Sequence, residues 1–167
     1  MSELTHLPTR LASVAAGLAG IVAVATAAVG SVDAIAIAVV GFICLSAGLV
    51  RGTRLAVDVG CLLVFAGVVV SGLGSDSVEL TMLGTVAVVI AWDLGQDGID
   101  LGEQLGRETA TARLETVHIV SSLFVGLLAA TLGYGVYLFA ADGQPASAVV
   151  LLLLAACFVV IGLSSRG

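Results

Sequence analysis

The chain has 167 residues, of which 59% are hydrophobic and 11% charged, and its mean hydropathy is +1.19. Soluble domains contain roughly 45–50% apolar and about 25% charged residues, so this composition excludes a water-soluble fold and indicates an integral membrane protein. Six spans of roughly 20 residues would use about 120 residues, which leaves too few for an extramembrane enzyme, receptor or nucleic-acid-binding domain. We therefore expect a single transmembrane domain over residues 1–167, with the lipid bilayer as its surroundings and no nucleic-acid partner.

Acidic residues outnumber basic residues by 12 to 6, and every basic residue is an arginine. Excess negative charge keeps proteins soluble at high ionic strength. Because the chain also lacks lysine, this balance predicts a salt-adapted, haloarchaeal origin. Cys44, Cys61 and Cys157 lie in apolar runs, where a thiol behaves as a small hydrophobic group, so we expect no disulfide and no metal site.

Six apolar runs follow one another along the chain, separated by short polar stretches. Each is long enough to cross a bilayer as an α-helix. The first run is longer than the apolar core of a cleaved signal peptide, so we expect it to be retained. The predicted fold is an all-α bundle of six transmembrane helices, at about residues 11–30, 32–50, 55–74, 78–94, 116–140 and 146–163.

The arginines predict the orientation of this bundle. If the N-terminus is cytoplasmic, all six arginines fall on the cytoplasmic side, as the positive-inside rule requires. We therefore expect a multi-pass protein of the cell membrane with both termini in the cytoplasm. The opposite side then carries acidic residues and no cation: Asp33, Asp76, Glu79 and Asp142.

Small residues recur within the predicted helices at spacings that place them on one face, as Gly60, Gly67 and Gly74 do in the third helix. In a bilayer, such faces let helix backbones approach closely. We expect them to pack the bundle, and also a homo-oligomer, rather than to line a pore.

The longest polar stretch, at about residues 95–115, is expected to connect the fourth and fifth helices as a short cytoplasmic amphipathic segment. Each glycine within a helix costs roughly 1 kcal/mol relative to alanine, so we predict breaks near Gly95 or Gly98 and at Gly106. On an unbroken helix, most of the polar residues would share one face, within about 80°. The candidate partner surface of this segment and its flanks consists of Asp93, Asp97, Asp100, Gln104, Glu108, Arg113, Glu115 and His118.

Three interpretations of this acidic face stay open. It is a surface for a protein partner, a site for a hard cation that binds carboxylate oxygens, or a solvated helix whose acids reflect adaptation to salt. His118 adds a further alternative, because histidine exchanges protons near neutral pH and Asp93 and Glu115 lie within its reach.

Asp58 lies within the first turn of the third predicted span, four residues after Arg54. An intramembrane carboxylate is a candidate functional group. Because residues four apart share a helix face, we predict an Arg54–Asp58 ion pair at the inner interface. The alternative is that Asp58 binds an ion or a proton.

The sequence contains no nucleophile elbow, no zinc-protease motif, no phosphate-binding loop and no cluster of cysteine and histidine. Asp93, Asp97-Gly98 and Ala112-Arg113 resemble part of the motif of the CDP-alcohol phosphatidyltransferases, but Ala112 follows Gly98 too late and the motif's last residues are absent. We therefore predict no catalytic residue, no cofactor and no enzymatic activity.

The connection between the fourth and fifth helices contains four distinctive stretches: Trp92–Gln96, Leu101–Glu108, Thr111–Glu115 and Val117–His118. They resemble an uncharacterised haloarchaeal family of six-helix integral membrane proteins, whose genes lie in clusters that encode MoxR-type ATPases. The resemblance implies partners in a membrane complex and supplies no activity.

These observations predict a non-enzymatic membrane subunit or scaffold that presents its charged cytoplasmic segment to a partner or to its own oligomer. The alternative is a small secondary transporter or ion channel, although no small-molecule substrate is indicated. A membrane-embedded lipid enzyme ranks third because the motif spacing fails.

Overall fold

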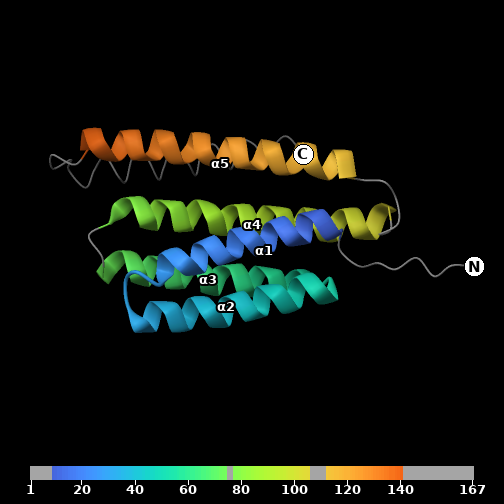
Figure 1. Cartoon of the computed structure of the whole chain (residues 1–167), viewed down its shortest axis with the longest axis horizontal. Helices are drawn as coiled ribbons and strands as arrows, with labels where there is room; N and C mark the ends of the chain where they lie inside the picture. Colours follow the sequence, from blue (N-terminus) through green and yellow to red (C-terminus); the bar gives the residue numbers. More distant parts are fainter. Residues whose placement is uncertain (1–8, 75–76, 106–111, 141–167) are drawn as a thin grey trace, which may run out of the picture. The chain divides into compact units, whose positions relative to one another are not determined.

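The computed structural model describes residues 9–74, 77–105 and 112–140. These residues form five α-helices, shown in Figure 1: α1 (Arg10–Ala27), α2 (Val32–Arg51), α3 (Arg54–Gly74), α4 (Val78–Leu105) and α5 (Ala112–Ala140). The chain divides into two compact units, Met1–Thr131 and Leu132–Gly167, and the contacts described below lie within the first. The predicted all-α fold is confirmed, and the sixth predicted span, at 146–163, lies outside the described residues.

Four of the described helices contain a stretch long and apolar enough to cross a membrane. The stretch in α1, Leu11–Ala27, is apolar but shorter. The chain is thus a membrane-embedded helical protein, as its composition predicts. The four stretches are Val32–Arg51, Arg54–Gly74, Val78–Gly102 and Glu115–Gly135.

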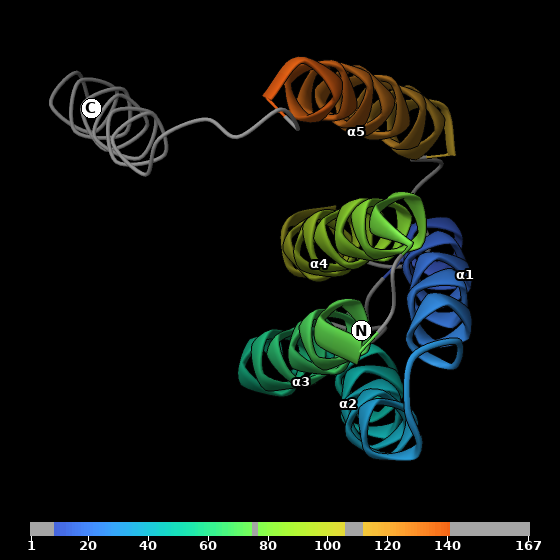
Figure 2. The same cartoon turned by 90° about the vertical axis from the view of Figure 1, so that its left-hand side faces the viewer.

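Helices α1 to α4 pack against one another, with α2 beside α3 and α4 beside both α1 and α3 (Figures 1 and 2). Gly41 of α2 and Gly60 of α3 face each other where their helices cross. A β-carbon added to Gly41 would lie 2.6 Å from the backbone nitrogen of Val64 and 2.8 Å from the carbonyl oxygen of Gly60. The small residues therefore bring these backbones into direct contact, as we predicted for Gly60.

Local signals set both ends of α2. Ser31 caps α2, since its side chain accepts a hydrogen bond from the backbone nitrogen of Ala34 at 3.1 Å. At the other end, Gly52 adopts the left-handed conformation with φ 68°, which costs glycine little. The chain then reverses directly into α3 at Arg54.

Helix α4 is the main departure from the sequence prediction. We expected the span to end at residue 94 and the chain to break near Gly95 or Gly98, but α4 is continuous to Leu105. These glycines sit at helix crossings: an added β-carbon would lie 3.0 Å from Val57 Cγ1 at Gly95, and 3.0 Å from Ala12 Cβ at Gly98. Contacts with α3 and α1 outweigh the low helix propensity of glycine. The break predicted at Gly106 falls outside the described residues.

Candidate functional site

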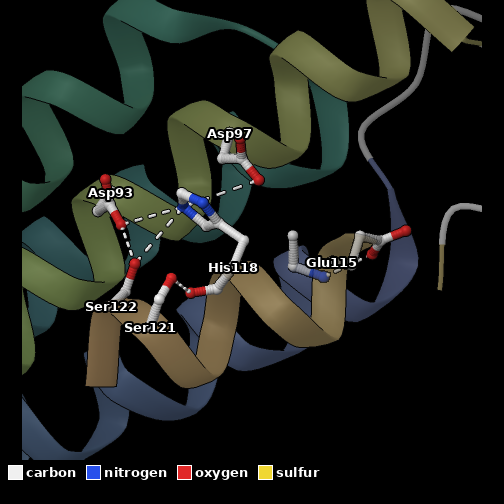
Figure 3. A network of polar contacts seen from close by, with 7 residues as sticks. Asp93, Asp97, Glu115, His118, Ser121 and Ser122 are labelled. Carbon is white, nitrogen blue, oxygen red and sulfur yellow. Dashed lines mark hydrogen bonds and ion pairs between the residues drawn. The ribbon is translucent and has the colours of Figure 1, made fainter. Parts of the chain in front are cut away.

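Polar side chains from three helices meet around the part of α4 that runs from Trp92 to Asp100. Asp93 and Asp97 lie one helical turn apart on α4, and His118 and Ser122 lie one turn apart on α5, so each pair presents its side chains on one face. Figure 3 shows these two pairs directed toward each other. We call Asp93, Asp97, His118 and Ser122 the α4–α5 polar cluster.

Asp93 is the centre of the α4–α5 polar cluster. Its Oδ2 accepts a hydrogen bond from Ser122 Oγ at 2.5 Å and lies 3.2 Å from His118 Nε2. A carboxylate only accepts hydrogen bonds, so Nε2 is the nitrogen through which His118 donates. Asp97 Oδ2 lies 3.8 Å from the same nitrogen (Figure 3). The same imidazole nitrogen therefore lies near two carboxylates, Asp93 and Asp97.

A second set of contacts joins α3 to α4. Asp58 Oδ1 accepts hydrogen bonds from Trp92 Nε1 at 2.7 Å and from Gln96 Nε2 at 2.6 Å, and Arg54 forms an ion pair with Asp100. We predicted that Arg54 is the partner of Asp58, but the structure directs both side chains to α4. The reason is the length of α4: because it continues past residue 94 beside α3, it offers partners that a shorter helix would lack.

Glu115 occupies a different position from the one predicted. It is 4% exposed, and its Oε2 accepts a hydrogen bond from the backbone nitrogen of Ala12 at 3.1 Å. Ala12 lies in the first turn of α1, where backbone nitrogens lack partners within the helix and a carboxylate is favourable. The N-cap residue Thr9 makes no side-chain cap bond. Glu115 is therefore buried against α1 and stabilises its start.

A model of a family of unknown function, DUF7519, matches residues 6–160. The chain belongs to the DUF7519 family. No curated protein and no solved structure matches it. The family match covers every described residue and includes the whole polar site, which agrees with the resemblance to an uncharacterised family stated above.

Most described residues of the predicted partner surface contact other residues of this DUF7519 chain. Asp93, Asp97 and His118 belong to the α4–α5 polar cluster, and Asp100 pairs with Arg54. Glu115 faces α1, and Arg113 is exposed. The side chain of Gln104 and the whole of Glu108 lie outside the described residues.

Three residues of the site were not predicted as members: Trp92, Gln96 and Ser122. Ser122 follows His118 at helical spacing, and Gln96 follows Trp92 in the same way, so spacing alone could have grouped each pair. Spacing does not show which neighbouring helix each pair faces. Within residues 9–74, 77–105 and 112–140, no group of three or more histidine, cysteine or acidic side chains is arranged to hold a metal ion.

Two grooves in the DUF7519 structure flank Trp92. The groove between α4 and α5 has a volume of about 470 Å³, and the groove between α3 and α4 has a volume of about 510 Å³. Trp92 and Val89 line both grooves. Asp93, His118 and Ser122 lie at the first, and Asp58 lies at the second. Each groove therefore combines apolar walls with a carboxylate at its polar end.

Proposed function

We propose that the protein is a non-enzymatic integral membrane subunit or scaffold that binds a partner, or a second copy of itself, through α5. The observation that carries this proposal is the division of roles between the two sides of α5. Its polar residues His118 and Ser122 bind α4, and Glu115 binds α1. Its large apolar side chains face outward, among them Phe124, which is 66% exposed.

This proposal places the partner surface on α5, whereas the sequence predicted it on the charged segment between the fourth and fifth helices. The described acids Asp93, Asp97 and Asp100 of α4 contact α3 and α5, which supports a role in holding these helices together. Without a hydrophobic drive in lipid, helices associate through close packing, and the outward side of α5 is available for such a contact. Among the described members of the predicted partner surface, Arg113 at the start of α5 is exposed, and Asp93, Asp97, Asp100 and His118 are partly exposed.

Site-specific cross-linking tests the proposal. A photoreactive residue is placed at position 124 on α5, and the matched control carries it at position 43, because Ile43 on α2 is 63% exposed. We expect a protein adduct from position 124 in native membranes and none from position 43. Adducts to lipid alone at both positions would overturn the proposal.

We also infer that the chain crosses the membrane six times with both termini in the cytoplasm, the sixth span being residues 146–163. This topology is supported by the distribution of the arginines. Reporter fusions or cysteine labelling at residues 76 and 142 test it, and either residue in the cytoplasm would contradict it. The acidic, lysine-free composition supports a haloarchaeal origin, and with it an association with MoxR-type ATPase complexes.

The absence of enzymatic activity is likewise proposed. A serine nucleophile needs a histidine between it and the carboxylate, so that the imidazole can take the serine proton. In the α4–α5 polar cluster, Ser122 donates directly to Asp93 Oδ2, and His118 directs its Nε2 to the same oxygen. Ser122 Oγ lies farther from His118 Nε2, at 3.5 Å, than from Asp93 Oδ2, and this order of contacts supports a structural cluster.

A small secondary transporter or channel is the second candidate. The observation that favours it is the set of contacts among Asp93, His118 and Ser122, which join two apolar helices at one end of a groove. Such groups mark ion or proton pathways in many membrane proteins. Flux measurements in liposomes test it, with Asp93→Asn and Asp58→Asn as variants. A saturable flux that either variant abolishes would place this function above the subunit role.

A further inference from the structure

The groove between α4 and α5 has the two-part character of an amphiphile site. At one end lie Trp92 and the polar residues Asp93, His118, Ser121 and Ser122. From there, apolar side chains of both helices line the walls. These walls include Val86, Val89, Ile90, Val125 and Ala129.

The dimensions of the groove suit one alkyl chain. Along α4 its lining runs from Asp93 to Thr85, which is roughly 12 Å at a helical rise of 1.5 Å per residue. Its volume of about 470 Å³ falls in the range of small-molecule sites in proteins. An extended chain of decyl length fits this distance, with its head group at the Asp93 end.

The charge at the polar end selects the head group. Contacts between Asp93 and other described residues use Oδ2, and the Asp93 side chain is 46% exposed at the groove. Asp97 adds a second carboxylate nearby, and His118 is the basic residue among the lining side chains. A negative end of this kind repels anionic head groups and attracts cationic ones.

Trp92 is a second feature of the groove that favours a cationic head group. An indole ring attracts ammonium groups through its face, especially where water is scarce. The bond from Trp92 Nε1 to Asp58 Oδ1 holds the ring at the boundary between the two grooves. Asp58 likewise accepts two donors on one oxygen, but it is the one charged residue among the described residues that line the groove between α3 and α4, whereas Asp97 lies close to Asp93.

We propose that the α4–α5 groove binds an amphiphilic organic cation, with the ammonium group between Asp93 and Trp92 and the alkyl chain along Val86, Val89 and Val125. This site goes beyond the proposed subunit role, since it uses the side of α5 that lines the groove with α4, and Phe124 is not among the lining residues. Binding and cross-linking are therefore independent readouts, and either proposal stands if the other fails.

The full chain contains a single tryptophan, so the fluorescence of Trp92 reports on both grooves. The purified protein in nanodiscs is titrated with decyltrimethylammonium, and decyl sulfate serves as the probe of equal chain length and opposite charge. We expect a saturable change in emission with the cation and none with the anion. Asp93→Asn should weaken binding by about tenfold or more, because it removes the charge next to the ammonium group.

Three further variants make the result specific, provided each retains its helical content and elutes as one species. Asp33→Asn removes a charge in the first turn of α2 and should leave the affinity unchanged. Val125→Phe fills the apolar groove without changing charge and should also weaken binding, so the proposal stays testable if Asp93→Asn does not fold. Equal responses to both probes, unaltered binding in Val125→Phe, or a larger loss in Asp58→Asn than in Asp93→Asn would each overturn the proposal.

Discussion

Glu115 offers a direct test of how α5 is tied to the bundle, because its carboxylate caps a helix that lies 103 residues away in sequence. Replacing it by alanine removes the acceptor for the Ala12 backbone nitrogen and leaves that donor buried. Loss of an N-terminal cap costs about 0.5–2 kcal/mol, and an unsatisfied buried donor costs about 1–3 kcal/mol. Since both figures describe the same bond, we expect Glu115→Ala to lower the free energy of unfolding by about 1–3 kcal/mol.

Thermal unfolding in a mild detergent measures this loss. At roughly 2–4 °C per kcal/mol for a chain of this size, Glu115→Ala should unfold about 2–12 °C below the wild type. Glu115→Gln is the matched control, because its amide oxygen still accepts the bond while the negative charge is removed, whose effect at a helix N-terminus is about 0.3–1 kcal/mol. If Glu115→Ala unfolds with the wild type, or if both variants lose the same stability, the bond to Ala12 is not what stabilises α1.

The remaining predictions concern helix packing and ion pairing. Gly60→Ala should lower the free energy of unfolding by about 1–3 kcal/mol, because its β-carbon would overlap the backbone of α2; Gly17→Ala, whose β-carbon meets nothing within 4 Å, should leave stability unchanged or raise it by up to about 1 kcal/mol. Equal melting temperatures for these variants would contradict the close crossing. A double-mutant cycle between Arg54 and Asp100 should give a coupling of about 0.2–1 kcal/mol, as partly exposed pairs do, and the cycle between Arg54 and Asp58 should give none.

Composition and hydropathy predict most of this fold because a membrane span is defined by a property of its own residues. The expected starts of the second to fourth spans, at residues 32, 55 and 78, agree closely with α2, α3 and α4. The predicted end of the fourth span, at residue 94, was wrong because it rested on local helix propensity. Helix propensity is local, whereas the contacts of Gly95 and Gly98 depend on residues 57 and 12, which the sequence does not place beside them.

The candidate site divides in the same way. The sequence places His118 within reach of either Asp93 or Glu115, and the structure brings it to Asp93 while Glu115 turns to α1. The sequence positions of Asp93 and Glu115 are both compatible with a contact to His118. What separates them is the rotation of α5 about its axis, which depends on packing with α1 and α4 together.

The acidic face of α4 shows why residues that share a helix face need not share a function. At about 100° per residue, Asp93, Asp97 and Asp100 lie within about 60° of one another, so they form one face in sequence. The structure places the boundary between two neighbouring helices along this face: Asp93 and Asp97 contact α5, and Asp100 contacts Arg54 of α3. The same acids thereby join three helices into one polar layer. A substitution in this layer therefore alters the position of α3 or α5 relative to α4, and the shape of the groove on that side of Trp92 changes with it.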